Sequence, residues 1–454
     1  MRLRERWVRA CALAVLMLSS SVAWAQTAQP TRTPATAATA AAAAERFSKG
    51  APFPAWVDPV RELPSTQTRA PAVILVADTQ FHAAATPAVH VHRAVQVNSH
   101  GAIDSVGTFT LEFNPAYEHL DLHVLRIIRD GTALDRLAAA TPAFLQRETQ
   151  LDRSIYTGEV SASFVINDVR MGDVVEYAYT RRGQNPVLGG KFVDSASFDR
   201  DLPTELRRVS LLKPRERDIR WRMVSNDPGQ ALQPVTSERD GMTRLLWEAR
   251  ALPRVEVDRD VPSHYRPYRE IHFSEFATWG EVAVWAADLF KLEAQASPEL
   301  DAVAATINGK ATEDERASAA LQWVQAQIRY FSLALGESTH RPAAPSVTLT
   351  RRFGDCKDKT ALLIALLDRV GIPAQPVLVS ARHVRGLQSL PPSPYAFDHA
   401  IVLARIDGKP YYLDPTRVGQ VGRVAAMGQR WEGAEVLVAA PQTQELTTVV
   451  AHGK

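Results

Sequence analysis

The segment at residues 361–367, A-L-L-I-A-L-L, constrains the fold more than any other part of the chain. It is apolar around about two turns of a helix, and a helix without a polar face is stable only where other elements cover it on all sides. Gly371 follows at a position where a glycine commonly ends a helix. The sequence therefore predicts a helix that is buried inside a domain and ends just before Gly371.

Charged residues surround the start of this helix in the motif G-D-C-K-D-K. Asp355 is suited to the N-cap position, with Asp358 three residues later, so Cys356 is expected at the first helical position. There the unpaired backbone N–H groups and the positive end of the helix dipole favour an anion, and Lys357 and Lys359 add positive charge. The two aspartates oppose part of this effect. On balance the pattern favours the thiolate form of Cys356, which is the nucleophilic form.

The cysteine content sharpens this interpretation. The chain has two cysteines, and Cys11 lies in a predicted leader peptide, so the exported protein would carry Cys356 as its one thiol. A lone cysteine is commonly a small buried hydrophobic residue. The charged motif around Cys356 favours a reactive residue instead, since a core residue would be expected among the leucines that follow. The amides of the same helix end could also bind the oxyanion that forms when sulfur attacks a carbonyl.

A β-hairpin is predicted downstream of the helix. Residues 398–406 have the dense apolar character of a strand, and Asp407-Gly408 favours a two-residue type I′ turn. Residues 411–414 form the return strand, which ends before Pro415.

The turn also sets the register of this hairpin. If Ile406 pairs with Lys409, His399 and Asp414 fall on the same face as diagonal neighbours, with α-carbons about 7–8 Å apart. A single histidine in a strand is more often a structural residue. An aspartate at this spacing, however, gives the base and orienting carboxylate of a catalytic triad. We therefore predict that Cys356, His399 and Asp414 act together as nucleophile, general base and orienting residue.

The first 25 residues have the pattern of a secretory signal peptide, with four arginines, a short apolar run and the small-residue site A-W-A. Their removal takes away four Arg and one Glu and changes the formal net charge from +2 to −1. This leaves no polybasic surface of the kind that nucleic-acid binding needs. No apolar segment reaches the roughly 20 residues of a membrane span. We expect a periplasmic or secreted protein, with no membrane span and no nucleic acid as a partner.

The rest of the chain divides by composition and periodicity. Residues 26–64, rich in Ala, Thr and Pro, are predicted to be a disordered linker. Residues 65–255 contain short alternating apolar runs and turn signals, which are typical of a β-rich, sandwich-like domain whose strands are half exposed to solvent. Helical spacing begins after Phe273, so a second domain is expected at 270–420, followed by a C-terminal extension at 421–454.

Capping boxes mark two helices of the second domain. Thr278 with Glu281 precedes one helix, and Thr312 with Glu315 precedes the other. The second helix carries an apolar stripe made of Ala317, Ala320, Leu321, Val324 and Ile328. Helices that follow a β-rich region give an α+β fold class.

Three separated motifs resemble those of the transglutaminase-like superfamily, which shares the papain-like Cys-His-Asp chemistry. They are G-D-C-K-D-K-T at 354–360, D-H-A at 398–400 and Y-L-D-P-T at 412–416, in the chain order of the family. The resemblance covers residues 275–420 and implies helices packed on an antiparallel sheet.

The resemblance also implies roles for individual residues. It assigns Cys356 as the nucleophile, His399 as the general base and acid, and Asp414 as the orienting carboxylate. The region at 70–250, which includes V-R-M-G-D-V-V-E-Y, resembles the domain of unknown function that often precedes this catalytic domain in exported bacterial proteins. Relatives of this architecture usually continue with a further β-rich region, whereas this chain ends 40 residues after Asp414. We therefore expect a shortened version or a fragment.

The leading functional hypothesis is acyl transfer or hydrolysis at amide or peptide bonds through a thioester, without cofactor or metal. The substrate would be a protein or peptide, with cell-envelope peptides as one candidate. The sequence leaves open whether water or an amine resolves the thioester. Two alternatives stay open as well: a non-catalytic cell-envelope binding module that keeps the triad as a scaffold, and a protein in which the N-terminal β-rich domain is the main functional part.

Other candidate residues have simpler interpretations. His82, His90, His92 and His100 are candidates for a metal site, but a solvated strand face is favoured because no carboxylate or cysteine completes the set at a recognised spacing. Aromatic residues at helical spacing are more often core residues, and this interpretation is favoured for Trp279, Trp285, Tyr330 and Phe331. The sequence does not place four further residues near the site or away from it, namely His340, Arg341, Arg351 and Arg352.

Overall fold

A computed structural model describes residues 33–34, 37–146, 155–156, 158–226, 231–258, 260–262, 264–291, 297–333 and 336–450. The predicted signal peptide at 1–25 lies outside these residues. Within them, no helix is both long and apolar enough to cross a membrane.

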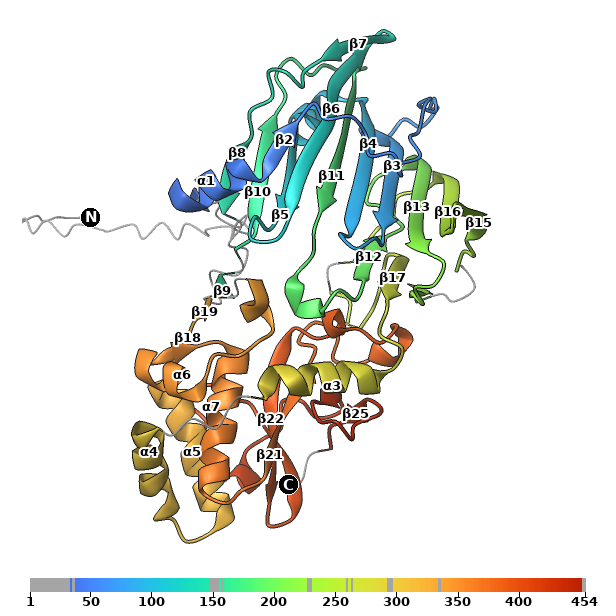
Figure 1. The fold of residues 1–454 in the computed structure, drawn as a ribbon. Helices are drawn as coiled ribbons and strands as arrows, with labels where there is room; N and C mark the ends of the chain where they lie inside the picture. Colours follow the sequence, from blue (N-terminus) through green and yellow to red (C-terminus); the bar gives the residue numbers. More distant parts are fainter. Residues whose placement is uncertain are drawn as a thin grey trace, which may run out of the picture. The chain divides into compact units, whose positions relative to one another are not determined.

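A large mixed sheet forms the centre of the N-terminal region (Figure 1). Its strands run in the order β15-β16-β13-β3-β4-β11-β6-β2, and β7 pairs with β6. Most neighbours are antiparallel, but β13 pairs with β3, and β2 with β6, in parallel. The strands are β2 (Phe47–Lys49), β3 (Ala72–His82), β4 (Ala88–Val97), β6 (His119–Arg129), β7 (Thr132–Asp135), β11 (Val174–Arg182), β13 (Thr204–Pro214), β15 (Val235–Arg239) and β16 (Met242–Leu252).

Two smaller sheets pack on this large sheet. One has the order β1 (Thr33–Pro34), β8 (Ala143–Gln146), β10 (Val160–Val165) and β5 (Thr108–Phe113), with α2 (Ile103–Gly107) before β5. The other has the order β12 (Val193–Ser197), β17 (Glu270–Ser274) and β14 (Arg220–Val224). Phe109 stacks on Tyr177 at 4.2 Å between ring centroids, and Phe81 contacts Phe273 at 5.1 Å. Because apolar rings fill the space between facing sheets, the prediction of a sandwich-like, β-rich domain is confirmed.

One face of the large sheet differs from the prediction. The strands were expected to be half exposed to solvent and the histidines of β4 to lie on a solvated face, but Glu176, Thr180, His90 and His92 are all buried. The cause is a segment at residues 51–58 that lies over these strands. Its contacts are a hydrogen bond from His123 to the Ala51 carbonyl, edge-on packing of Phe53 on His90 and His123, and stacking of Trp56 on His82.

The prediction of a disordered linker at 26–64 is therefore wrong from residue 37 onward. Helix α1 (Ala37–Glu45) buries Ala43, and β2 pairs with β6. The physical reason is that Phe47, Phe53, Trp56 and Val57 follow the Ala-rich stretch, and they supply the apolar area that ordering the chain requires.

The second region is a helical layer on an antiparallel sheet, so the α+β prediction is confirmed. Its helices are α3 (Trp279–Phe290), α4 (Pro298–Asn308), α5 (Glu313–Gln327), α6 (Pro345–Arg351) and α7 (Cys356–Arg369). The sheet has the order β23 (Lys409–Leu413), β22 (His399–Ile406), β21 (Ala374–Val379), β24 (Glu435–Val438) and β25 (Thr447–Thr448). Two short parallel pairs complete the description: β18 (Arg329–Tyr330) with β20 (Phe353–Gly354), and β9 (Ile155–Tyr156) with β19 (Ser332–Leu333).

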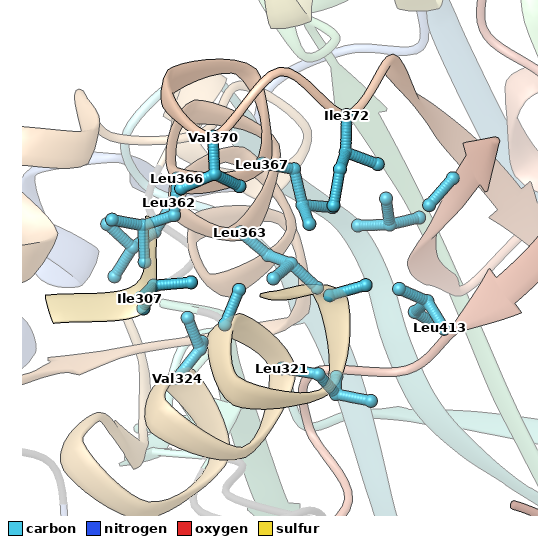
Figure 2. Close-up of a cluster of buried hydrophobic side chains, with 14 of the residues drawn as sticks. Ile307, Leu321, Val324, Leu362, Leu363, Leu366, Leu367, Val370, Ile372 and Leu413 are labelled. Carbon is cyan, nitrogen blue, oxygen red and sulfur yellow. The ribbon is translucent and has the colours of Figure 1, made fainter. Parts of the chain in front are cut away.

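Helix α7 runs through the interior as predicted, packed between α5 and the strands β21 and β22 (Figure 1). Figure 2 shows its leucines surrounded by side chains of α4, α5 and the sheet. The helix ends in a Schellman motif: the Gly371 amide donates to the Asp368 carbonyl at 3.0 Å, and the Ile372 amide to the Leu367 carbonyl at 2.9 Å. Ile372 and Leu367 then share the same apolar core, which fixes the exit of the chain toward β21.

The predicted extension at 421–454 is part of this sheet. β24 pairs with β21, and β25 pairs with β24, while Trp431 and Leu437 are buried. Strand β17 lies inside the range 270–420 that was predicted for the second domain, but it pairs with β12 and β14 of the N-terminal region. In both cases strand pairing joins segments that lie far apart in the sequence.

Candidate active site

Cys356 is the first residue of α7 and forms no disulfide within the described residues. Asp355 is the N-cap, and it forms a capping box with Asp358: each side chain accepts a hydrogen bond from the backbone N–H of the other residue, both at 3.3 Å. Cys356 is partly exposed, whereas the rest of α7 behind it is mostly buried. The predicted position of the sulfur at a helix N-terminus is therefore confirmed.

The charges around this helix end are paired. Lys357 forms an ion pair with Asp355, and Arg351 forms one with Asp358. The carboxylates that were expected to oppose a thiolate are thus each matched by a cation. Lys359 behaves differently from the expectation, because its ammonium group is buried and donates to the Ile328 carbonyl at 2.7 Å. Burial lowers the pKa of Lys359 to about 8, and the charge of Asp414 opposes part of that shift.

His399 lies on β22 and contacts both of its predicted partners. Its Nε2–H donates to Asp414 Oδ2 at 3.2 Å, and its ring lines one cavity together with Cys356. Because Nε2 faces the carboxylate, Nδ1 is the nitrogen left for the sulfur. Burial alone would lower the pKa of His399, but the hydrogen bonds and charges of Asp414 and Cys356 raise it to about 10.

Asp414 follows the last paired residue of the hairpin. Ile406 pairs with Lys409 as predicted, and the ladder ends at Val402 with Leu413. The Asp414 carboxylate also accepts hydrogen bonds from the Thr416 amide at 3.0 Å and from the Thr416 hydroxyl at 2.6 Å. Although burial would raise its pKa, the bonds from His399 and Thr416 lower the pKa of Asp414 to about 2.

Long-range hydrogen bonds bring the helix and the hairpin together. The hydroxyl of Thr360, one turn after Cys356, donates to the carbonyl of Ala400, the residue after His399, at 3.1 Å. On the other side, the Gln325 side chain of α5 donates to the Asp414 carbonyl at 3.0 Å. Both contacts are buried, so they fix the spacing between the sulfur, the imidazole and the carboxylate.

Two residues at this site were not predicted. Tyr330 lies beside the start of α7, where burial together with the charges of Cys356, Asp355 and Asp414 raises the pKa of its phenol. Trp431 lies against the His399 ring, with 5.6 Å between centroids, and its Nε1–H donates to Asp414 Oδ2 at 3.3 Å.

Sequence signals for these two residues were weak. Tyr330 was interpreted as a packing residue, and Trp431 lay in the predicted extension. Tyr330 reaches the site because β18 pairs with β20, directly before α7, and that pairing is visible only in three dimensions.

A cavity of about 140 Å³ adjoins the sulfur and the imidazole. It is lined by Trp285 and His340, so the packing interpretation of Trp285 is incomplete and His340 does border the site. Trp279, in contrast, packs on Phe397 at 5.7 Å as a core residue. The remaining candidates lie elsewhere: Phe331, Arg341 and Arg351 line a neighbouring cavity, and Arg352 lies over the Trp323 ring.

The histidines of the N-terminal region do not assemble a metal site in the part of the chain that the structure describes, where no group of three His, Cys, Asp or Glu side chains could hold an ion. His92 instead contacts the Glu176 carboxylate at 2.9 Å, and His90 contacts the Thr180 hydroxyl at 3.1 Å.

Comparisons with known proteins match both regions. A family model of the transglutaminase-like superfamily matches residues 301–409, and a model of the domain of unknown function DUF3857 matches residues 84–256. None of the curated proteins matches the chain.

Among solved structures, the chain is similar to that of a "putative protease" from Parabacteroides distasonis, with 15% identity and a TM-score of 0.65, over 84% of this chain and 73% of that one. A "putative cysteine protease" from Cytophaga hutchinsonii also matches, with 16% identity over 73% of this chain and 76% of that one, at a TM-score of 0.21. The first of these shows a shared fold. The N-terminal region thus resembles DUF3857 domains, and the C-terminal region resembles the transglutaminase-like superfamily.

Proposed function

We propose that the protein is an exported cysteine enzyme that performs acyl transfer or hydrolysis at amide or peptide bonds. The observation that carries the proposal is the position of His399, which hydrogen-bonds the Asp414 carboxylate and lines one cavity together with Cys356. A raised imidazole pKa, here about 10, supports an imidazolium that balances a thiolate at neutral pH.

In the proposed cycle, His399 first holds the proton of the Cys356 thiol. The thiolate adds to the substrate carbonyl carbon, and the carbon–nitrogen bond then breaks as His399 gives that proton to the leaving amine. A thioester on Cys356 remains. Neutral His399 next takes a proton from water or from an acceptor amine, which attacks the thioester and releases a carboxylic acid or a new amide. Asp414 keeps the imidazole oriented throughout.

The oxyanion of the tetrahedral intermediate needs hydrogen-bond donors near the sulfur. Tyr330 is the residue that we assign to this task. Its hydroxyl lies beside the Cys356 amide at the start of α7, so its O–H is near the carbonyl that the sulfur would attack.

Thiol labelling tests the proposed pair directly. The purified protein is treated with iodoacetamide at pH 6–7, alongside His399→Ala, a control His100→Ala at an exposed position, and the denatured chain. We expect the native protein and the control to react faster than the other two, because His399 maintains the thiolate. Equal labelling of all four samples would contradict the proposal and favour a non-catalytic cell-envelope binding module.

The fate of the thioester and the export of the protein need separate measurements. Mass spectrometry of cell-envelope peptides after incubation distinguishes cleavage from new isopeptide bonds, since hydrolysis adds water and cross-linking releases ammonia. N-terminal sequencing of protein from the periplasmic or secreted fraction is expected to begin at Gln26, directly after the A-W-A site. A chain that stays in the cytoplasm and keeps Met1 would refute export.

A further inference from the structure

The cavity beside the catalytic residues has a chemical character that points to a class of substrate. Apolar side chains form most of its lining, and they come from α3, β21 and the loop before β22: Trp285, Ala286, Leu289, Phe290, Leu378, Pro394 and Phe397. Cys356 and His399 line the same cavity. A group that occupies it is therefore attached within a few bonds of the carbon that the sulfur attacks.

The polar residues of the lining offer little to a charged ligand. Lys357 is ion-paired with Asp355, and Asp398 accepts a hydrogen bond from the Ala381 amide at 2.5 Å. His340 contacts the Thr339 hydroxyl at 2.8 Å. Burial, with a smaller contribution from the charge of Lys357, lowers the pKa of His340 to about 4, so this side chain is neutral at pH 7.

The size of the cavity is informative as well. Its volume of about 140 Å³ is close to that of the engineered protein cavity of about 150 Å³ that stays dry and binds benzene. A phenyl ring or a branched aliphatic chain would fill such a space. A carboxylate would meet only Lys357, which is already ion-paired, and an ammonium group only Asp398, which already accepts a hydrogen bond and lies 3.9 Å from Arg382.

We propose that this cavity binds the side chain of the residue whose carbonyl is attacked, and that it selects large apolar side chains, aromatic or branched aliphatic. The inference rests on the proposed function. It favours backbone amides that follow residues such as Phe and Leu over the side-chain amide of Gln, because a Gln substrate would place a polar chain and no bulky group in the cavity.

A panel of matched peptides measures this selectivity. Each carries an N-terminal blocking group, two alanines, a variable residue X and a fluorogenic amine, with X as Phe, Leu, Ala, Gln, Glu or Lys. We expect kcat/KM to be at least about tenfold higher for Phe and Leu than for Ala, and lower still for Glu and Lys. A second series varies the residue on the leaving side, and selectivity found only there would overturn the assignment.

A filled cavity gives the matching variant. Ala286→Phe places a ring into the space, and Val284→Phe adds the same ring at an exposed position of the same helix. The first variant is expected to lower kcat/KM for the Phe and Leu peptides more than for the Ala peptide and so to lose the preference, and the second to keep the wild-type preference. An unchanged preference in Ala286→Phe would refute the proposal. If that variant does not fold, Leu289→Ala, which enlarges the cavity, is expected to shift the optimum to X as Trp, and an unshifted optimum would refute it.

The peptide panel and the thiol labelling together distinguish a failure of the selectivity from a failure of the proposed function. A flat wild-type panel together with labelling of Cys356 that depends on His399 would refute the selectivity but leave the cysteine enzyme intact. If the His399→Ala variant is labelled as fast as the wild type and no peptide is cleaved, the proposed function itself is refuted.

Discussion

Asp414 is a carboxylate that remains ionised inside the protein because three kinds of donor reach it: an imidazole, a hydroxyl with its backbone amide, and an indole. Its pKa, lowered to about 2, means that it stays charged over the whole range in which the enzyme would work. The charge of Asp414 in turn supports the raised pKa of His399.

Replacement of Asp414 with Asn removes that charge but keeps the shape. We expect kcat to fall on the order of 10³- to 10⁴-fold, because the imidazolium loses its partner and the ring its orientation. The pKa of His399, measured by NMR titration, is expected to fall below its wild-type value of about 10. Asp368→Asn, at an exposed position of α7, is the control. An unchanged NMR titration in Asp414→Asn would argue against the orienting role.

Tyr330→Phe removes one hydroxyl from the proposed oxyanion site. Loss of a single oxyanion donor typically costs about 10²- to 10³-fold in kcat, so we expect a loss of that size with KM nearly unchanged. The pH dependence of labelling at Cys356 is expected to stay as in the wild type, because the His399 pair is intact. A loss confined to KM would contradict a role in the transition state. Tyr395→Phe, at an exposed tyrosine, serves as the control.

For single residues, local sequence patterns predicted that Cys356, His399 and Asp414 would lie together. Tyr330 and Trp431 were missed, because only pairing between distant strands brings them to the site. The N-cap and the Asp-Gly turn are read from adjacent residues, and each places one side chain of the site. Trp431, by contrast, reaches Asp414 only after β24 has paired with β21, and no local pattern encodes that pairing.

At the scale of elements, the approach of α6 and β20 to the start of α7 depends on Gly354. A β-carbon at this residue would lie 2.7 Å from the Asp358 β-carbon and 3.1 Å from a methyl group of Thr348. Asp358 belongs to the capping box that begins α7 beside Cys356, and Thr348 is a fully buried residue of α6, so an added carbon at residue 354 would displace the start of α7.

Gly354→Ala is therefore expected to lower the free energy of unfolding by about 1–3 kcal/mol and to slow labelling of Cys356. Chemical denaturation and iodoacetamide kinetics measure the two effects. Gly309→Ala is the matched control, because its added methyl group would meet no atom closer than 3.8 Å. Equal stability of the two variants would show that the helix start tolerates the extra carbon.

The elements that the sequence predicted well are those with local signals. Thr278, Thr312 and Asp355 each cap a helix as expected, and the hairpin register follows from its turn. The covering segment at 51–58 and the strands β24 and β25 were missed, because their order comes from packing against distant strands rather than from their own composition.

At the scale of the whole molecule, the buried polar face of the large sheet ties stability to pH. The Nδ1–H of His123 donates to the Ala51 carbonyl, so its Nε2 accepts from the Thr180 hydroxyl, which in turn accepts from His90. Phe53 covers the rings of His90 and His123, and the pair of His92 and Glu176 lies nearby on the same strands. Burial, with the charges of His123 and His92, lowers the pKa of His90 to about 3.

A histidine with a lowered pKa binds fewer protons in the folded state, so its contribution to stability is complete above pH 6.5 and is lost as the pH falls from 6.5 toward 3. At pH 5 this amounts to about 2 kcal/mol. We expect His90→Gln to lose less thermal stability between pH 7.5 and pH 5 than the wild type, and His100→Gln, at an exposed position, to lose as much. Identical pH slopes in calorimetry for all three proteins would exclude His90 as the source.

The α+β class and the order of the two regions were predictable from periodicity, which changes from two residues to 3.6 near Phe273. The packing of the sheets against one another was not predictable, because it depends on which faces of the sheets meet. Polar residues such as Glu176 look solvent-facing in sequence and are buried once another segment lies over them.

The strands β24 and β25 extend the sheet that carries His399, and the indole of Trp431 donates a hydrogen bond to the Asp414 carboxylate. The ribosome makes these residues after Cys356, His399 and Asp414. The proposed triad is therefore expected to assemble only once this last portion has emerged and docked, and proteolytic cleavage between residues 417 and 430 is expected to disturb it without touching Cys356.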